Sequence, residues 1–153
     1  MQDTLPIHFA PLQGYTEAIY RNAHDAFFGG VDTYYTPFVR LEKGNFRRRD
    51  VRGIEPENNG VPHLIPQLIA SSAEKAEVIL SLFIEKGYQE VDINLGCPFP
   101  LLAKRHNGSG ILPYPEEVKA LLSIVTRYPQ ISFSVKMRLG WEQPDECLAL
   151  API

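Results

Sequence analysis

A thiol and an amide side chain follow a short apolar run near the middle of the sequence. The run ends in Asn94-Leu95-Gly96-Cys97-Pro98, so one tight turn separates the Asn94 amide from the Cys97 thiol. An unperturbed thiol, with a pKa of about 8.5, is protonated at neutral pH and can act as a general acid. A nucleophilic role would require a lowered pKa, caused by Lys136 or by a neighbouring base. The alternative is a small buried cysteine with a packing role only.

Polar side chains on two other apolar segments could complete a site. Lys136 lies in Ser134-Val135-Lys136-Met137-Arg138, and an enclosed lysine needs an anionic or acceptor partner, such as an electron-rich cofactor ring. The alternatives are an internal ion pair with Asp92 or an ammonium group that reaches solvent. Gln67 offers a donor and an acceptor suited to the edge of a heterocycle. A satisfied amide in the core is its competing interpretation.

Five apolar segments must position these residues, and they alternate with segments of helical period. Repeated strand and helix patterns predict a parallel sheet. In the last two segments the polar residues fall on one face, as the two-residue period of a strand requires. A (β/α) barrel of the TIM type explains this, because helices cover the outer face and polar side chains face an enclosed lumen. Pro66 is an exception that predicts a local bulge. The strands are expected near residues 7–10, 33–39, 63–70, 90–95 and 131–138.

Three helices are expected between these strands. The first opens at Thr16 and stops before Gly29, the second covers about 72–86 with a capping box of Ser71 and Glu74, and the third runs from Pro115 to near Arg127. Residues at helical spacing mark the faces that should be buried. These are Ile19, Ala23 and Phe27 in the first helix, Ala73, Ala76, Leu80, Phe83 and Ile84 in the second, and Val118, Leu121, Leu122 and Val125 in the third.

Composition indicates one globular domain, since 44% of the residues are apolar and 22% are charged. A complete barrel of this type needs about 250 residues, so the 153 residues are expected to form its N-terminal portion, truncated after about five strands. The unclosed edge would favour self-association.

Other features bear on location and metal binding. The longest apolar run, Val78–Ile84, is too short to span a membrane, and residues 1–6 lack the pattern of a secretion signal, so we expect the cytosol. In that reducing compartment Cys97 and Cys147 should be free thiols. No Cys/His spacing typical of a metal site accompanies them, and no metal is expected.

Basic residues gather in two places although the net charge is −3. One cluster runs from Lys43 to Arg52, and Lys104 and Arg105 lie on the loop after Cys97. Both could contact phosphates, while a solvated surface is the alternative for the first cluster. The nearby Asn107-Gly108-Ser109-Gly110 lacks the spacing of known phosphate loops.

Taken in order, several motifs together resemble the dihydrouridine synthases. They are Ala10-Pro11-Leu12 with Gly14, Pro66-Gln67-Leu68, Asp92-Ile93-Asn94-Leu95-Gly96-Cys97-Pro98, Arg105-His106-Asn107-Gly108-Ser109-Gly110 and Val135-Lys136-Met137-Arg138. The resemblance implies an FMN-bound TIM barrel, joined to a small helical tRNA-binding domain, that uses NADPH to reduce selected uridines in tRNA. The later strands, which would complete the FMN phosphate site, and the helical domain are expected to be absent from residues 1–153.

The resemblance also implies roles for individual residues. Reduced FMN would pass a hydride to C6 of the uracil, and Cys97 would protonate C5 as the general acid. Asn94 would help to position the base. The tRNA phosphates would be met by Lys104, Arg105 and the cluster from Arg47 to Arg52. The isoalloxazine ring would be held by Ala10, Pro11, Leu12, Gln67 and Lys136, with Arg138 as a weaker candidate.

Two other functions remain open at this point. One is another FMN-dependent barrel reductase of a small pyrimidine-like substrate, such as a relative of dihydroorotate or dihydropyrimidine dehydrogenase. The other is a non-catalytic fragment that only associates with RNA or with another protein. The second predicts that the chain binds no flavin.

Overall fold

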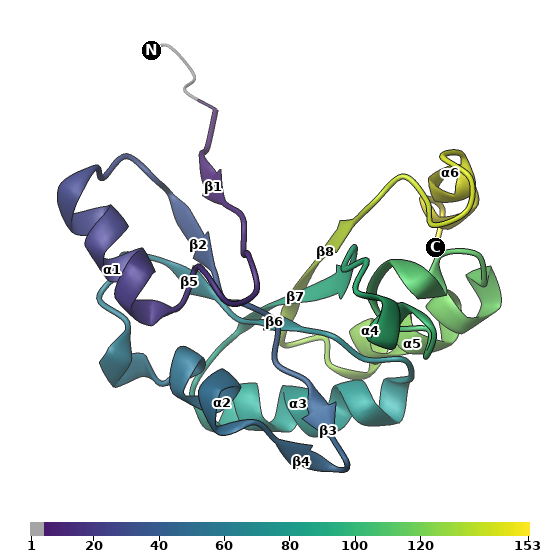
Figure 1. The fold of residues 1–153 in the computed structure, drawn as a ribbon. Coiled ribbons are helices and arrows are strands. Elements are labelled where there is room, and N and C mark those ends of the chain that lie inside the picture. Colours follow the sequence, from purple (N-terminus) through teal and green to yellow (C-terminus); the bar gives the residue numbers. More distant parts are fainter. Residues whose placement is uncertain (1–4) are drawn as a thin grey trace. The chain divides into compact units, whose positions relative to one another are not determined.

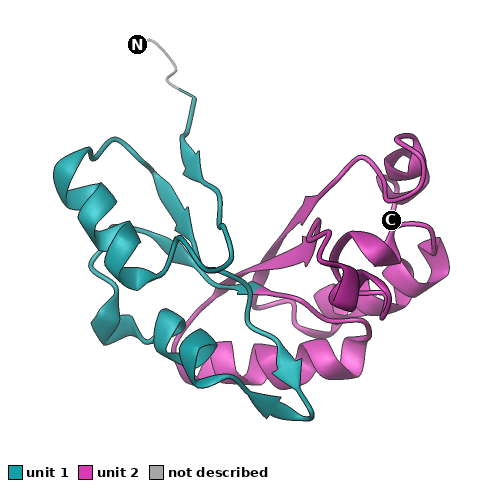
Figure 2. Ribbon diagram, in the orientation of Figure 1, with its two compact units in different colours: residues 1–67 teal, residues 68–153 magenta. Residues whose placement is uncertain are grey.

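The computed structural model describes residues 5–153. The chain divides into two compact units, residues 1–67 and 68–153 (Figure 2). Parallel strands and helices follow one another along both units (Figure 1). This confirms the expected α/β class and is compatible with part of a TIM barrel, although residues 5–153 form no closed barrel.

The first unit is built on a parallel sheet of order β1-β2-β5. Its strands are shorter than expected, and an antiparallel hairpin and a second helix, neither predicted from the sequence, follow β2. In chain order the elements are β1 (His8–Phe9), α1 (Ala18–Phe27), β2 (Thr33–Tyr35), β3 (Leu41–Glu42), β4 (Asn45–Phe46), α2 (Arg48–Ile54), the 3₁₀ turn η1 (Pro56–Asn58) and β5 (Leu64–Ile65).

The hairpin β3–β4 turns on two residues with positive φ. Lys43 has a φ of 51° and Gly44 a φ of 80°. Two-residue hairpin loops of this kind match the twist of the flanking strands, and they usually carry Asn-Gly or Asp-Gly. The Lys-Gly pair lacks that signature, and for this reason the sequence did not reveal the hairpin.

Helix α1 turns a different face inward from the one expected. Arg21 is fully buried, and its guanidinium donates to the main-chain carbonyls of Thr16, at 2.6 Å, and Gly53, at 2.9 Å. The hydrophobic pattern missed this orientation because it gives weight to apolar side chains only. The side chains expected to be buried are instead exposed to solvent: Ile19, Ala23 and Phe27.

The second unit contains the longest strands. Strands β7 (Glu90–Leu95) and β8 (Ser132–Met137) pair in parallel in a sheet of order β6-β7-β8. The division between the units falls within the short strand β6 (Gln67–Leu68) along the chain. Pro66 separates β6 from β5, so the strand expected over 63–70 is two strands. The helical elements are α3 (Ala73–Glu85), α4 (Pro100–Ala103), the 3₁₀ turn η2 (Gly108–Ile111), α5 (Pro115–Arg127) and α6 (Glu146–Leu150).

Helices α3 and α5 occur where the sequence predicts them, with small corrections. Ser72, not Ser71, caps α3 by accepting a hydrogen bond from the Lys75 N–H. Ile84 and Val125 were expected in the core but are partly exposed. The core-facing residues are Ala73, Ala76, Ile79, Leu80 and Phe83 on α3 and Val118, Leu121 and Ile124 on α5. No helix within residues 5–153 has both the length and the apolar character needed to cross a membrane.

Candidate active site around Cys97

The turn after β7 is organised by the side chain of Asn94. Its Oδ1 accepts hydrogen bonds from the N–H groups of Gly96, at 3.1 Å, and Cys97, at 2.9 Å. Asparagine commonly folds the chain into a turn in this way. Asn94 is buried, and its oxygen places Cys97 directly after the end of the strand. This structural use of the amide was not foreseen from the sequence.

The carbonyl of Cys97 is held from a later part of the chain. Ser109, in η2, donates to it twice, from its N–H and from its hydroxyl, each at 3.0 Å. The Cys97 thiol itself is free and half-buried. Cys147, on α6, is also free, as expected. Within the described range, no three or more His, Cys, Asp or Glu side chains are grouped as metal ligands would be.

Lys136 lies on β8 directly opposite Asn94 in the parallel register. Its side chain is exposed, whereas the sequence predicted an enclosed one. The alternative, an ion pair between Lys136 and Asp92, is not present within residues 5–153; Asp92 accepts a hydrogen bond from Ser134 Oγ at 2.7 Å. The Lys136 ammonium has neither an ion pair nor a hydrogen bond with any residue from 5 to 153. It is therefore a cation available to a ligand.

Arg138, just beyond β8, contacts the same turn. Its Nε donates to the carbonyl of Gly96 at 2.7 Å. At least one of its donors is therefore used to hold the segment that carries Cys97. Asn94, Cys97, Ser109 and Arg138 are brought together by the pairing of β7 with β8 and by the return of the chain through η2.

The loop that carries Lys104 and Arg105 is fixed by the residue that follows it. His106 has a φ of 52°, its Nδ1 lies 2.7 Å from Glu117 Oε2, and its ring stacks on Tyr114 with centroids 4.1 Å apart. Lys104 and Arg105 themselves are exposed. The sequence singled out these two cations but gave no sign of the anchor.

The remaining predicted residues belong to the first unit. Residues 10–12 follow β1, and the Leu12 carbonyl accepts from the N–H of Thr16 at 3.1 Å. Gln67 is fully buried, with its N–H donating to Thr36 Oγ1 at 3.0 Å. The role expected of both segments, contact with a flavin ring, stays a prediction.

Gln13 is a further candidate that the sequence did not suggest. Both polar atoms of its amide are enclosed, yet neither has a hydrogen-bond partner within residues 5–153. Buried polar groups almost always have a partner, so an orphaned amide calls for an explanation such as a ligand. Its place next to residues 10–12 puts it in the segment expected to lie along a cofactor.

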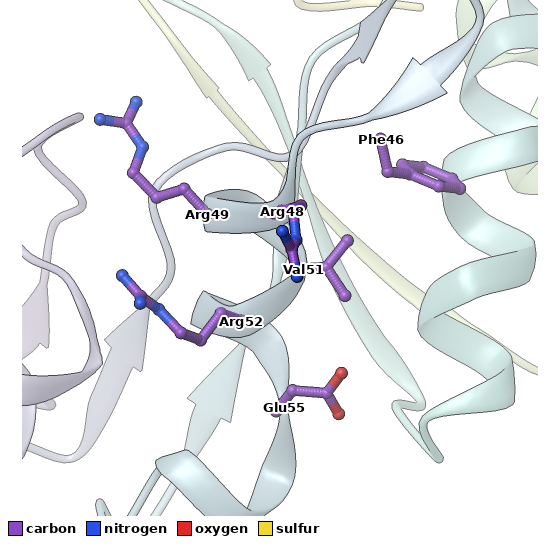
Figure 3. A pocket seen from close by; sticks show the side chains of 6 residues that line it. All are labelled: Phe46, Arg48, Arg49, Val51, Arg52 and Glu55. Carbon is purple, nitrogen blue, oxygen red and sulfur yellow. The ribbon is translucent and has the colours of Figure 1, made fainter.

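A basic hollow of about 580 Å³ lies on α2 (Figure 3). Arg49 and Arg52 extend to one side of the helix, and Phe46 and Val51 lie on the other. Arg49 pairs with Asp50 at 3.9 Å, whereas Arg52 makes no ion pair within the described part of the chain. The complete lining is Phe46, Arg48, Arg49, Val51, Arg52 and Glu55.

Asp50 sits at the centre of this basic cluster. Its carboxylate lies 3.8 Å from Arg47 and 3.9 Å from Arg49, and one oxygen, Oδ2, is enclosed without a hydrogen-bond partner in residues 5–153. Burial raises the pKa of Asp50, and this effect outweighs the arginines, which act to lower it. At 3.8 and 3.9 Å, Arg47 and Arg49 do not offset the free-energy cost of removing the Asp50 carboxylate from water.

Comparison with known proteins gives the same family for the family model and for the individual relatives. The family model described as dihydrouridine synthase (Dus) matches residues 8–153. A tRNA-dihydrouridine(16) synthase of Pseudomonas putida is 30% identical over 156 aligned positions, which cover 96% of this chain and 48% of that protein. The tRNA-dihydrouridine(16) synthase of Haemophilus ducreyi is 28% identical over 162 positions, covering 95% and 47%.

A further relative matches a shorter region. The tRNA-dihydrouridine synthase B of Klebsiella pneumoniae is 31% identical over 88 positions, covering 57% of this chain and 27% of that protein. The chain thus spans from 27% to 48% of the length of these curated relatives. Because the family model covers nearly all of the described residues, the chain belongs to the dihydrouridine synthase family.

Proposed function

We propose that the chain carries the catalytic acid of a tRNA-dihydrouridine synthase, which reduces uridine in tRNA to 5,6-dihydrouridine. The observation that carries this proposal is the turn from Asn94 to Cys97, which presents a half-buried thiol at the end of β7 in a chain of this family. In this proposal the chain forms the N-terminal portion of a flavin-dependent barrel.

The residues present are suited to a flavin. The Lys136 ammonium lacks an anionic partner, and the Gln13 amide lacks any partner, within residues 5–153. A cation and an amide are the groups that an anionic, heterocyclic ring edge would engage. Bound FMN, reduced by NADPH, would supply the hydride that reaches C6 of the uracil. In the second unit, Lys136 would contact the ring. In the first unit, the family resemblance implies the same role for Gln67 and residues 10–12, and Gln13 directly follows that segment.

Cys97 would supply the other hydrogen. Its Sγ–H donates a proton to C5 of the uracil as C6 accepts the hydride, so the C5–C6 double bond is reduced without a net change in charge on the base. The thiolate that remains regains a proton from solvent, which a half-buried side chain allows. General acids of this kind contribute roughly 100- to 10,000-fold to rate.

Exposed cations would meet the tRNA backbone. Lys104 and Arg105 lie on the loop anchored by His106, and Arg48 and Arg52 line the hollow on α2. Phosphate contacts are independent of sequence and weaken with salt, and each contact contributes a salt-dependence slope of about −0.9 for a duplex. Arg52→Gln should therefore reduce the salt-dependence slope for tRNA binding by the value of about one phosphate contact. Arg127 is already paired with Glu77, so Arg127→Gln should leave the slope unchanged.

Flavin binding tests the cofactor assignment directly. The protein is titrated with FMN and followed by flavin fluorescence, with Lys136→Ala as the test variant and Lys119→Ala, an exposed lysine on α5, as the matched control. We expect saturable binding that weakens in Lys136→Ala and is unchanged in Lys119→Ala. Equal binding by both variants would remove Lys136 from the flavin site, and no binding by any form would contradict the cofactor assignment for this chain.

A further inference from the structure

Ser109 makes contacts that the proposed reaction does not use. Its side chain is fully buried, and its hydroxyl and its N–H both donate to the Cys97 carbonyl, each at 3.0 Å. A carbonyl oxygen has two lone pairs, so these donors fill its capacity. The main chain at Cys97 is thereby fixed by a residue from a separate structural element, η2.

Gly108 makes this approach possible. A Cβ at this position would lie 2.5 Å from the Cys97 carbonyl oxygen and 2.9 Å from the Cys97 Cβ, distances that Cβ atoms in folded proteins essentially never show. Gly108 also has a φ of 60°, a conformation that side chains disfavour. Only glycine lets η2 come close enough for the Ser109 hydroxyl to reach the carbonyl. The next glycine, Gly110, similarly leaves no space for a Cβ against the Ala103 main chain.

The Cys97 main chain is held on its other side as well. Its N–H donates to Asn94 Oδ1 at 2.9 Å. The peptide groups before and after the Cys97 Cα are therefore both fixed, and the direction of the Cα–Cβ bond is fixed with them. The thiol keeps only rotation about its own side-chain bond.

We propose that Ser109 is a positioning residue for the Cys97 thiol, acting through the Cys97 carbonyl. Its catalytic meaning rests on the proposed function, in which Cys97 delivers a proton to one carbon atom. Displacement of a reacting group by about 1 Å can cost on the order of 100-fold in rate, so such an anchor has a clear purpose. Ser109 itself touches no reacting atom.

Thiol reactivity reports the position of Cys97 without any need for flavin or tRNA. The protein carries a second free thiol, Cys147 on α6, which provides an internal reference. Alkylation of both thiols by iodoacetamide is followed by mass spectrometry of their peptides over a range of pH. The test variant is Ser109→Ala, and the control is Ser123→Ala, which removes a hydroxyl that donates to a helix carbonyl at 2.7 Å.

We expect Ser109→Ala to accelerate alkylation of Cys97 by about 2- to 10-fold, since one hydrogen bond of ordinary net strength shifts a local opening equilibrium by that factor. The rate at Cys147 should not change, and Ser123→Ala should alter neither thiol. Unchanged rates at both thiols in Ser109→Ala would overturn the proposal. An equal acceleration at both thiols would also overturn it, because that result indicates general unfolding.

A second variant tests the same contact without removing the hydroxyl. Gly108→Ala should displace Cys97 and change its alkylation rate and the pH dependence of that rate. Gly87→Ala is the matched control, because Gly87 also has a positive φ, of 84°, but no atom lies within 4 Å of a Cβ there. If the two variants affect Cys97 alike, backbone strain explains the result and the proposed anchor is wrong.

Turnover separates this inference from the function on which it rests. If Ser109→Ala changes Cys97 alkylation and lowers the rate of uridine reduction with KM unchanged, the positioning role of Ser109 and the acid role of Cys97 are both supported. If Ser109→Ala changes the alkylation of Cys97 while Cys97→Ala leaves uridine reduction intact, Ser109 does position Cys97. In that case Cys97 is not the catalytic acid.

Discussion

Arg138 Nε donates a 2.7 Å hydrogen bond to the carbonyl of Gly96, joining the segment after β8 to the turn after β7. The bond lies next to the register pair Leu95 and Met137, at the end of both strands. It uses a donor of a residue that was expected at the cofactor ring. The guanidinium therefore has a structural role at the Cys97 turn, whatever it also contacts in a complete site.

Replacing Arg138 should weaken this turn. In Arg138→Met the Gly96 carbonyl loses a charge-assisted hydrogen bond, and we expect a loss of about 1–2 kcal/mol in the free energy of unfolding. Urea denaturation measures it. Arg127→Met is the control for loss of a surface arginine, whose pair with Glu77 should contribute less than about 1 kcal/mol. Equal losses in the two variants would show that the Gly96 contact contributes nothing specific.

Asn94 should be replaceable only by a residue that keeps its acceptor. Asn94→Asp retains an oxygen for the N–H groups of Gly96 and Cys97, whereas Asn94→Ala removes it. We expect faster hydrogen exchange of these amides in Asn94→Ala, by about 5- to 10-fold or more, and near-normal exchange in Asn94→Asp. Equal protection of both amides in the two variants would contradict the assigned role of the Asn94 oxygen.

The sequence predicted those parts of the fold that depend on local patterns. Helix α5 has the predicted bounds because Pro115 suits a first helical position and the apolar period is strong. Strand β7 likewise has the predicted bounds. The prediction of the buried face of α1 was wrong. That face carries Arg21, whose guanidinium donates to main-chain carbonyls, and an apolar pattern does not reveal such contacts.

The sequence predicted the reactive residues of the site but not the residues that hold them in place. Asn94 stands out as a polar residue near the end of a strand, Cys97 by its place in the turn that follows, and Lys136 by its place on a polar face. Ser109 and Gln13 have no such signal, because their significance lies in contacts or missing contacts that only the folded chain reveals. The exposure of Lys136 was also missed, since β8 is an edge strand in this sheet.

Asp50 gives unit 1 a pH-dependent stability. Burial raises its folded-state pKa above its ordinary value of 3.8, so the folded protein binds more protons between the two values. Its contribution to stability is fully present below about 3.8 and is lost as the pH rises through the folded-state pKa. Asp50→Asn should abolish this loss and raise the urea midpoint near neutral pH relative to the parent protein.

The control for this change is Glu57→Gln, which removes an exposed acid nearby. Urea midpoints are measured for all three proteins at about pH 3 and about pH 7, values that bracket ordinary carboxyl titration. A larger fall in stability between these pH values for Asp50→Asn than for the parent would contradict the assigned direction.

Arg21 is expected to be the most sensitive buried residue of unit 1. In Arg21→Met the carbonyls of Thr16 and Gly53 each lose the guanidinium as a donor, and Gly53 keeps only Asn59 Nδ2, at 3.2 Å. We expect a loss of about 2–4 kcal/mol in the free energy of unfolding. Arg48→Met, which removes an exposed arginine with no ion pair within residues 5–153, should cost less than about 1 kcal/mol. Thermal or urea unfolding followed by circular dichroism distinguishes them.

The role of Cys97 is tested most directly by dihydrouridine formation in Cys97→Ala, measured in tRNA beside flavin retention by the same protein. We expect a loss of turnover of roughly 100-fold or more, with flavin binding unchanged, because a general acid is removed and the ring contacts are not. Cys147→Ala, the other free thiol, should keep full turnover. Unchanged dihydrouridine formation by Cys97→Ala would contradict the assignment of Cys97 as the catalytic acid.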